Sequence, residues 1–268
     1  SRWFSEWTRL FESAADNFEN TTGLEFLGKA IRNHFDDELA HRARMMTIIR
    51  PALRAWKKLP KAQRVEAERA FGNYFKASTY DGSQGVIYDN APQVAKDLID
   101  AWLVVADTAG TLNQEAGIQV LDDNGWRDIG KVSNFYPRVL SELTERTLAS
   151  VDPLTGTAQD AEATEHWSRI VEALLAGGYI DKASEAMEYI RQQSVPTQTA
   201  DDFFSGIEMA RKKALPEIFY DWSLMPALNY IDHWATRYSQ IVNFGQKTDT
   251  QKDLFEQALD DLVYDQRT

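Results

Sequence analysis

Apolar side chains recur every three to four residues along almost the whole chain, and this spacing constrains the fold more than any other feature of the sequence. Such spacing places apolar side chains on one face of an α-helix. The clearest stripe lies in residues 224–242, where the apolar positions are Leu228, Ile231, Ala235, Tyr238 and Val242. We therefore predict a mainly α-helical protein, folded as a multi-helix, bundle-like array.

Proline, glycine and capping residues predict where these helices begin and end. Helices are expected at residues 2–19, 24–49, 60–76, 137–149, 161–176, 180–192, 224–242 and 249–264, and one more begins at Pro92 and weakens at Gly110. Pro51 is expected to end or kink the second helix, because proline removes a backbone donor and clashes with the preceding turn. Residues 77–90 are predicted to form a loop.

One short β-hairpin is predicted near residues 117–130. Two apolar segments, 118–121 and 126–129, flank the sequence Asp-Asp-Asn-Gly. Asn-Gly readily adopts the positive φ values of a two-residue hairpin turn. We therefore expect Asn124 and Gly125 to occupy the turn, with Gly125 at positive φ.

Residues 150–158 are the best candidate for a linker, because they are rich in turn-forming residues and lack a helical pattern. The predicted division is an N-terminal helical region with the hairpin at 1–149 and a C-terminal helical region at 159–268. One continuous domain is the alternative.

The composition excludes several classes of protein. The chain of 268 residues contains no cysteine, which excludes disulfide scaffolds, thiol nucleophiles and cysteine-ligated metal sites. No apolar run approaches the roughly eighteen residues that a membrane span requires. Residues 1–7 lack the apolar stretch of a signal peptide, so we expect no secretion by that route. Since Ser1 falls inside a helical pattern, we also expect the chain to be part of a longer protein.

Only one group of residues has the spacing of a metal site. His34, Glu38 and His41 lie at i, i+4 and i+7, and Glu38–His41 has the Glu-x-x-His form found in di-iron bundles. That site needs a second Glu-x-x-His on a partner helix, and the other two histidines do not provide it. A surface helix face is favoured, and no metal is predicted. Nucleophile elbows and phosphate-binding glycine loops are also missing, so no catalytic residue and no cofactor is predicted.

Basic residues concentrate in residues 42–76, which carry a net charge of +8 while the whole chain carries −12. Its densest part contains Arg42, Arg44, Arg50, Arg54, Lys57, Lys58 and Lys61. This stretch can contact the acidic half of the chain, form a solvated helix face, or bind phosphates or an acidic partner. Few aromatic side chains are interleaved with the cations, and the negative net charge repels DNA. Tight DNA binding at physiological salt is therefore not expected.

Two patterns in the second half of the chain resemble segments of the large polyvalent and internal virion (ejection-type) proteins of tailed bacteriophages and prophages. The first follows the hairpin and reads Ser133-Asn-Phe-Tyr-Pro-Arg138. The second comprises Glu208–Arg211, Leu215-Pro216, Tyr220, Ala227–Ile231 and Phe244-Gly245. The family-like residues are Phe135, Tyr136, Pro137, Arg138, Arg211, Leu215 and Pro216.

The resemblance implies a non-enzymatic helical structural or interaction segment, without catalytic residues, carried in the virion or delivered into the host. Its implied partners are other segments of the parent protein or other virion proteins, and its location is the virion or the bacterial cytoplasm. From the residues alone, the motif positions are interpreted as architectural, with Pro137 at the start of a helix. Two alternatives remain: an enzyme-associated helical domain whose site forms only in three dimensions, and a nucleic-acid-contacting module using residues 42–76.

Overall fold

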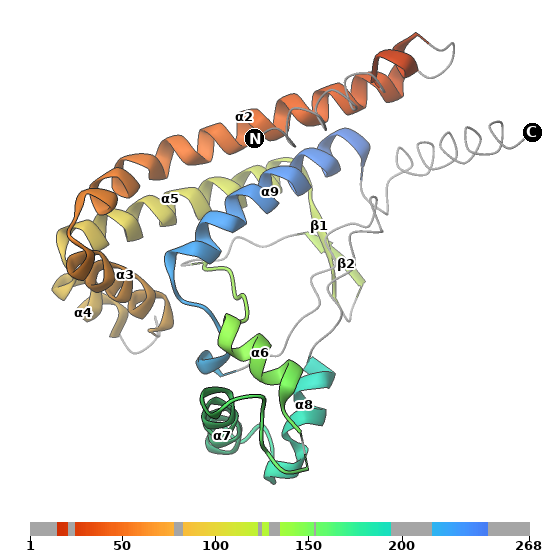
Figure 1. Ribbon diagram of the computed structural model, residues 1–268. Helices are drawn as coiled ribbons and strands as arrows, with labels where there is room; N and C mark the ends of the chain where they lie inside the picture. Colours follow the sequence, from red (N-terminus) through yellow and green to blue (C-terminus); the bar gives the residue numbers. More distant parts are fainter. Residues whose placement is uncertain are drawn as a thin grey trace, which may run out of the picture.

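The computed structural model describes residues 15–20, 25–77, 83–122, 125–128, 135–152, 154–193 and 216–245 (Figure 1). This part of the chain is mainly helical, as the apolar spacing predicts, and its only paired strands form one small hairpin. The predicted helix at 2–19 is described only for residues 15–19, which are helical. The predicted helix at 249–264 lies outside the described residues.

The longest helix, α2, runs from Glu25 to Lys58 and passes through Pro51. The predicted end at Pro51 is wrong, because the helix continues for seven residues beyond the proline. Pro51 itself is exposed, while Ala52 and Leu53 are buried in the core directly after it. We attribute the continuity to this packing, which offsets the cost of about 3 kcal/mol that an interior proline imposes.

Three other helices begin or end where the sequence indicates. α3 (Lys61–Lys76) and α5 (Gln93–Glu115) each follow a proline, Pro60 and Pro92. α9 (Leu224–Phe244) ends at Gly245, whose φ of 87° falls in the left-handed region that glycine adopts without strain.

The predicted loop at 77–90 is wrong for its second half, which forms the helix α4 (Ser83–Asn90). α4 has no apolar stripe, so its helical state depends on tertiary contacts rather than on its own pattern. Gln84 is buried and donates a hydrogen bond to the carbonyl oxygen of Tyr74 on α3, at 3.2 Å.

The hairpin forms as predicted, with β1 (Gln119–Asp122) antiparallel to β2 (Gly125–Asp128). Its register corrects the predicted turn by one residue. Gly125 pairs with Asp122 as the first residue of β2, so it is not one of the two residues between the strands. Those two positions, 123 and 124, lie outside the described residues.

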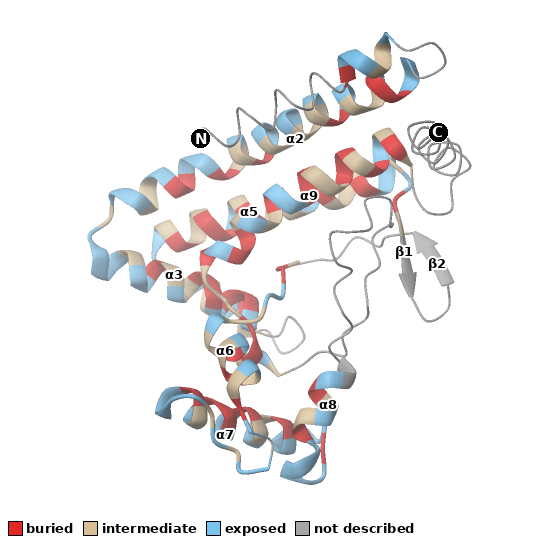
Figure 2. Cartoon of the chain, turned by 45° about the vertical axis from the view of Figure 1, so that its right-hand side comes forward, coloured by how far each residue is buried: buried red, intermediate tan, exposed pale blue. Residues whose placement is uncertain are grey.

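The larger of the two hydrophobic cores that the described residues form, here called the large cluster, lies among α2, α3, α5 and α9 (Figures 1 and 2). α2 packs along both α9 and α5, and α3 packs across α5. Fully buried side chains at its centre include Met45, Ile49, Phe71, Leu98, Ile99 and Trp102.

A second core, the small cluster, lies among α6 (Glu142–Ser150), α7 (Ala161–Ala176), the 3₁₀ turn η1 (Ala183–Glu185), α8 (Ala186–Gln193) and the 3₁₀ turn η2 (Glu217–Phe219). The prediction that Pro137 starts a helix is wrong, because α6 begins at Glu142. Ser141 caps it, since the Ser141 hydroxyl accepts a hydrogen bond from the Thr144 amide. The helix predicted at 180–192 is shorter in the structure, because residues 183–185 form the 3₁₀ turn η1 and α8 begins only at Ala186.

Residues 151–152 and 154–158 of the predicted linker, which follow the end of α6 at Ser150, make a turn. Asp152 pairs with Thr157 in an isolated β-bridge, and Gly156 has a φ of 68°. The large cluster takes side chains from both sides of this turn, because α9 packs against α2. The division into domains remains a prediction.

Candidate functional site

The described parts of the two sequence patterns that carry the family resemblance lie close together in space. The Val139 carbonyl oxygen accepts a hydrogen bond from the Asp221 amide at 2.8 Å, and the Ser141 amide donates to the Phe219 carbonyl oxygen at 3.0 Å. Leu140 and Tyr220 form an antiparallel bridge between them. Residues 135–141 and 219–223, called the joint below, therefore connect the large cluster to the small one.

Tyr136 occupies the centre of the joint. Its ring stacks between Phe75, with centroids 5.0 Å apart, and Trp222, at 5.5 Å. Its hydroxyl donates a hydrogen bond to the carbonyl oxygen of Ser223. Burial raises the pKa of the Tyr136 phenol, and the charges of Asp221 and Glu68 raise it further. The phenol therefore remains a protonated donor at neutral pH, which suits a structural role.

The residues beside Tyr136 are also used in packing. The Trp102 indole donates a hydrogen bond to the Phe135 carbonyl oxygen at 2.8 Å, and this bond fixes the joint to α5. The Arg138 guanidinium lies 5.7 Å from the centre of the Tyr220 ring, a cation–π contact. Pro137 lies outside any helix.

The rest of the motif is only partly described. Pro216 directly precedes η2, and its carbonyl oxygen accepts a hydrogen bond from the Phe219 amide at 3.1 Å. Arg211 and Leu215 lie outside the described residues. Contacts across the joint are separated by 78 to 87 positions in sequence, so no local pattern could have predicted them.

His34, Glu38 and His41 lie on the face of α2 that packs against α9. His34 is buried, with its Nε2 3.8 Å from a Glu38 carboxylate oxygen, and that carboxylate is also paired with Arg42 at 2.7 Å. His41 does not complete a triad, because its ring packs edge-on against Tyr238, at 4.7 Å, and Trp234, at 5.8 Å.

The electrostatics of these two histidines are those of packed neutral rings. Burial lowers the pKa of His34, although Glu38, the Ser239 backbone and Asp37 act in the opposite direction. Burial also lowers the pKa of His41. Across the described parts of the chain, no three His, Cys, Asp or Glu side chains gather closely enough to hold a metal ion.

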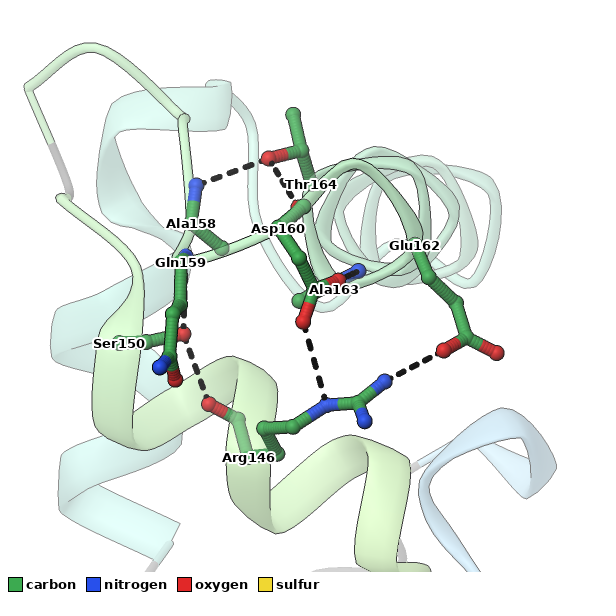
Figure 3. A network of polar contacts seen from close by, with 8 residues as sticks. All are labelled: Arg146, Ser150, Ala158, Gln159, Asp160, Glu162, Ala163 and Thr164. Atoms are coloured by element: carbon green, nitrogen blue, oxygen red, sulfur yellow. Dashed lines mark hydrogen bonds and ion pairs between the residues drawn. The ribbon is translucent and has the colours of Figure 1, made fainter.

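A polar network that sequence reasoning missed connects α6 to α7 (Figure 3). Arg146 pairs with Glu162 at 2.5 Å and lies 3.6 Å from Asp160, which in turn caps α7 by accepting from the Ala163 amide. Asp160 could have been found as a helix cap before an apolar pattern. Its ion pair with a residue fourteen positions earlier has no sequence signal.

A buried polar pair also connects the same two helices, α6 and α7. The Thr144 hydroxyl, fully buried, lies 2.9 Å from Nε2 of His166 and accepts a hydrogen bond from Ser141. Burial lowers the pKa of His166, and the charge of Arg169 lowers it further. A neutral His166 can accept a hydrogen bond from the Thr144 hydroxyl, so each of these two buried polar groups has a partner.

The predicted basic stretch divides into paired and unpaired side chains. Arg42 is half-buried and lies between two carboxylates, Glu38 and Asp232, the latter 2.9 Å away on α9. Arg64 lies over the Trp56 ring at 5.8 Å. The other cations are exposed and form no ion pair with a described residue: Arg44, Arg50, Arg54, Lys57, Lys58, Lys61, Arg69 and Lys76. We call these eight the basic strip.

Comparisons with known proteins identify no relative: no family model, no curated protein and no solved structure matches the chain. Among the helices that the structure describes, none is both long enough and apolar enough to cross a membrane.

Proposed function

We propose that this chain is a non-enzymatic, helical structural and interaction segment of a larger protein encoded by a tailed bacteriophage or prophage, carried in the virion or delivered into the host. The proposed partners are other segments of the parent protein or other virion proteins. The proposed location is the virion or the bacterial cytoplasm.

The joint is the observation that carries this proposal. Its two segments overlap the two separate patterns of the resemblance, at residues 135–138 and at Tyr220, and described residues of the two patterns contact each other. Phe135 packs against Tyr230 with ring centroids 5.0 Å apart, and Arg138 lies over Tyr220. A sequence motif that serves catalysis would aim polar groups at a substrate, whereas these side chains pack on each other, as a structural motif requires.

Mass spectrometry of purified phage particles tests the proposal. Particles would be induced from the bacterium that encodes the chain, treated with protease and nuclease to remove adhering host protein, and purified on a density gradient. Peptides from the well-ordered helices α2, α5 and α9 are expected in the particle fraction, in a constant ratio to a capsid protein. Their presence only in the cell fraction, or their loss on protease treatment, would contradict a virion-internal segment.

A further inference from the structure

The exposed cations of α2 form one continuous surface. Between residues 42 and 58 the helix contains six Lys or Arg and no Asp or Glu. Arg50, Arg54 and Lys57 lie at i, i+4 and i+7, so they follow one another along one side. By the same helical spacing, the buried Met45 and Ile49 lie on the opposite side of α2. The part of the basic strip on α2, from Arg44 to Lys58, is about 21 Å long at the rise of an α-helix.

The strip is not needed to hold this fold together. None of its eight members lies in an ion pair with a described residue, in contrast to Arg42 and Arg32 of the same helix. Lys57 and Lys58 lie in the last turn of α2, where a positive charge stabilises the helix end. That local effect falls off within one turn, so it does not account for Arg44, Arg50 and Arg54.

We propose that the basic strip is a docking surface for a carboxylate-rich face of another protein segment. This inference rests on the proposed role as an interaction segment and names the chemistry of the partner. A row of cations about 21 Å long matches the acidic face of a partner helix of similar length, with carboxylates at i, i+4 and i+7.

The rest of the molecule favours an acidic protein over a nucleic acid. The chain carries −12 overall and +8 in residues 42–76, so the remaining residues carry −20. A nucleic acid extends its negative charge beyond the strip and meets that repulsion, whereas an acidic patch on a protein ends where the strip ends.

The aromatic side chain nearest the strip is also occupied. The Trp56 indole donates a hydrogen bond to the Arg64 carbonyl oxygen at 3.2 Å, and the Arg64 guanidinium covers its ring. Its ring is therefore not open for stacking a base, which single-stranded nucleic acids use for much of their affinity.

Fluorescence anisotropy tests this inference with two labelled probes. One is a helical peptide of about 20 residues bearing glutamates at i, i+4 and i+7, and the other is a DNA duplex of about 20 base pairs. Both probes are longer than the row of cations on α2. The whole chain should bind the peptide more tightly than the duplex at about 150 mM NaCl, and lower salt should tighten peptide binding because the charges are exposed. The triple variant R50E/R54E/K57E should weaken peptide binding about tenfold or more, because three favourable pairs become repulsive.

A matched triple variant separates the strip from net charge. K29E/R169E/R191E makes the same change in charge at three exposed cations outside the strip, none of which pairs with a described residue. It should weaken peptide binding less than about threefold, since these sites lie beyond the docking face. Circular dichroism must show both variants folded, which their exposure favours.

Three outcomes would overturn the inference: no peptide binding, equal weakening by both variants, or tighter binding of the duplex than of the peptide. The last outcome would instead favour a nucleic-acid-contacting module. None of them depends on finding the chain in phage particles, so failure here and failure of the proposed function can be told apart.

Discussion

The large and small clusters are stabilised by different means. Twenty-one buried apolar side chains of the described residues form the large cluster. Among the buried polar groups on its helices, the Trp234 indole donates a hydrogen bond to Asn113 at 2.9 Å, whereas the Ser239 hydroxyl on α9 has no hydrogen-bond partner among the described residues. The small cluster has nine buried apolar side chains, and two of these, Phe219 and Tyr220, belong to the joint. Its periphery is held by ion pairs and caps around Arg146. Because apolar burial is the dominant favourable term in folding, the small cluster is expected to depend on the joint for its stability.

Removal of a large side chain from each cluster should have the largest effect and tests this dependence directly. Trp102→Ala removes a fully buried ring and its bond to the joint, and should lower the free energy of unfolding by about 3–5 kcal/mol. Ile170→Ala, in the small cluster, should lower it by about 2–5 kcal/mol. Urea titrations followed by both circular dichroism and tryptophan fluorescence measure these values.

Both variants are expected to show one transition with coincident probes, because the joint couples the clusters. If Trp102→Ala instead showed two unfolding transitions, one of them at the urea midpoint of the unaltered chain, the small cluster would be independent of the large one. The expected dependence on the joint would then be wrong.

A substitution at the closest backbone approach to the joint should have the next largest effect. A Cβ atom on Gly72 of α3 would overlap the carbonyl oxygen of Trp222, which packs on both clusters. Gly72→Ala should therefore cost about 1–3 kcal/mol in unfolding free energy. Gly85→Ala is the matched control, because a Cβ atom there meets nothing within 4 Å and α4 should gain up to about 1 kcal/mol of helix propensity. Equal effects of the two variants on the urea midpoint would show that the close approach is unimportant.

These contacts also explain which parts of the fold the sequence could predict. α5 and α9 have apolar stripes over their whole length and a proline or glycine at one end, so local spacing was sufficient. Pro51 was misinterpreted because the penalty for proline is local, whereas the packing of Ala52 and Leu53 is not. α4 was missed for the converse reason: its helix is stabilised through Gln84 and Tyr74 rather than by its own pattern.

The basic strip and the joint also differ in how far the sequence could predict them. The concentration of basic residues could be predicted because charge along a short stretch of sequence is a local property, although the separation of the basic strip from the paired Arg42 needed the position of Asp232 on α9. The residues of the joint were singled out by resemblance, but their interpretation was incomplete. Pro137 suggested a helix start, and nothing in the sequence indicates that Tyr136 reaches Ser223, 87 positions later.

A smaller, pH-dependent effect is expected at the buried His34. Since burial lowers the pKa of His34 below its ordinary value of about 6.5, the unfolded chain binds the proton more readily. Stability is therefore complete above about pH 6.5 and falls as the pH drops from there toward the folded-state pKa. His34→Leu removes this site, so its thermal midpoint should fall less than that of the unaltered chain between about pH 7.5 and about pH 5.5. A His34→Leu variant whose midpoint fell as much as that of the unaltered chain over this pH range would contradict the prediction.

The smallest effect is expected at the polar edge of the small cluster. Arg146→Met keeps most of the aliphatic part of the side chain but removes its pairing with Glu162 and Asp160. Because the side chains of Arg146, Asp160 and Glu162 are 39%, 43% and 70% exposed, water and salt already screen part of the attraction, and this substitution should have the smallest effect on stability. The loss should also shrink when the urea midpoint is measured in about 0.5 M instead of about 0.05 M NaCl, where screening is strong. A loss that matches Ile170→Ala and persists in high salt would show that this network, rather than the nine buried side chains and the joint, holds the small cluster together.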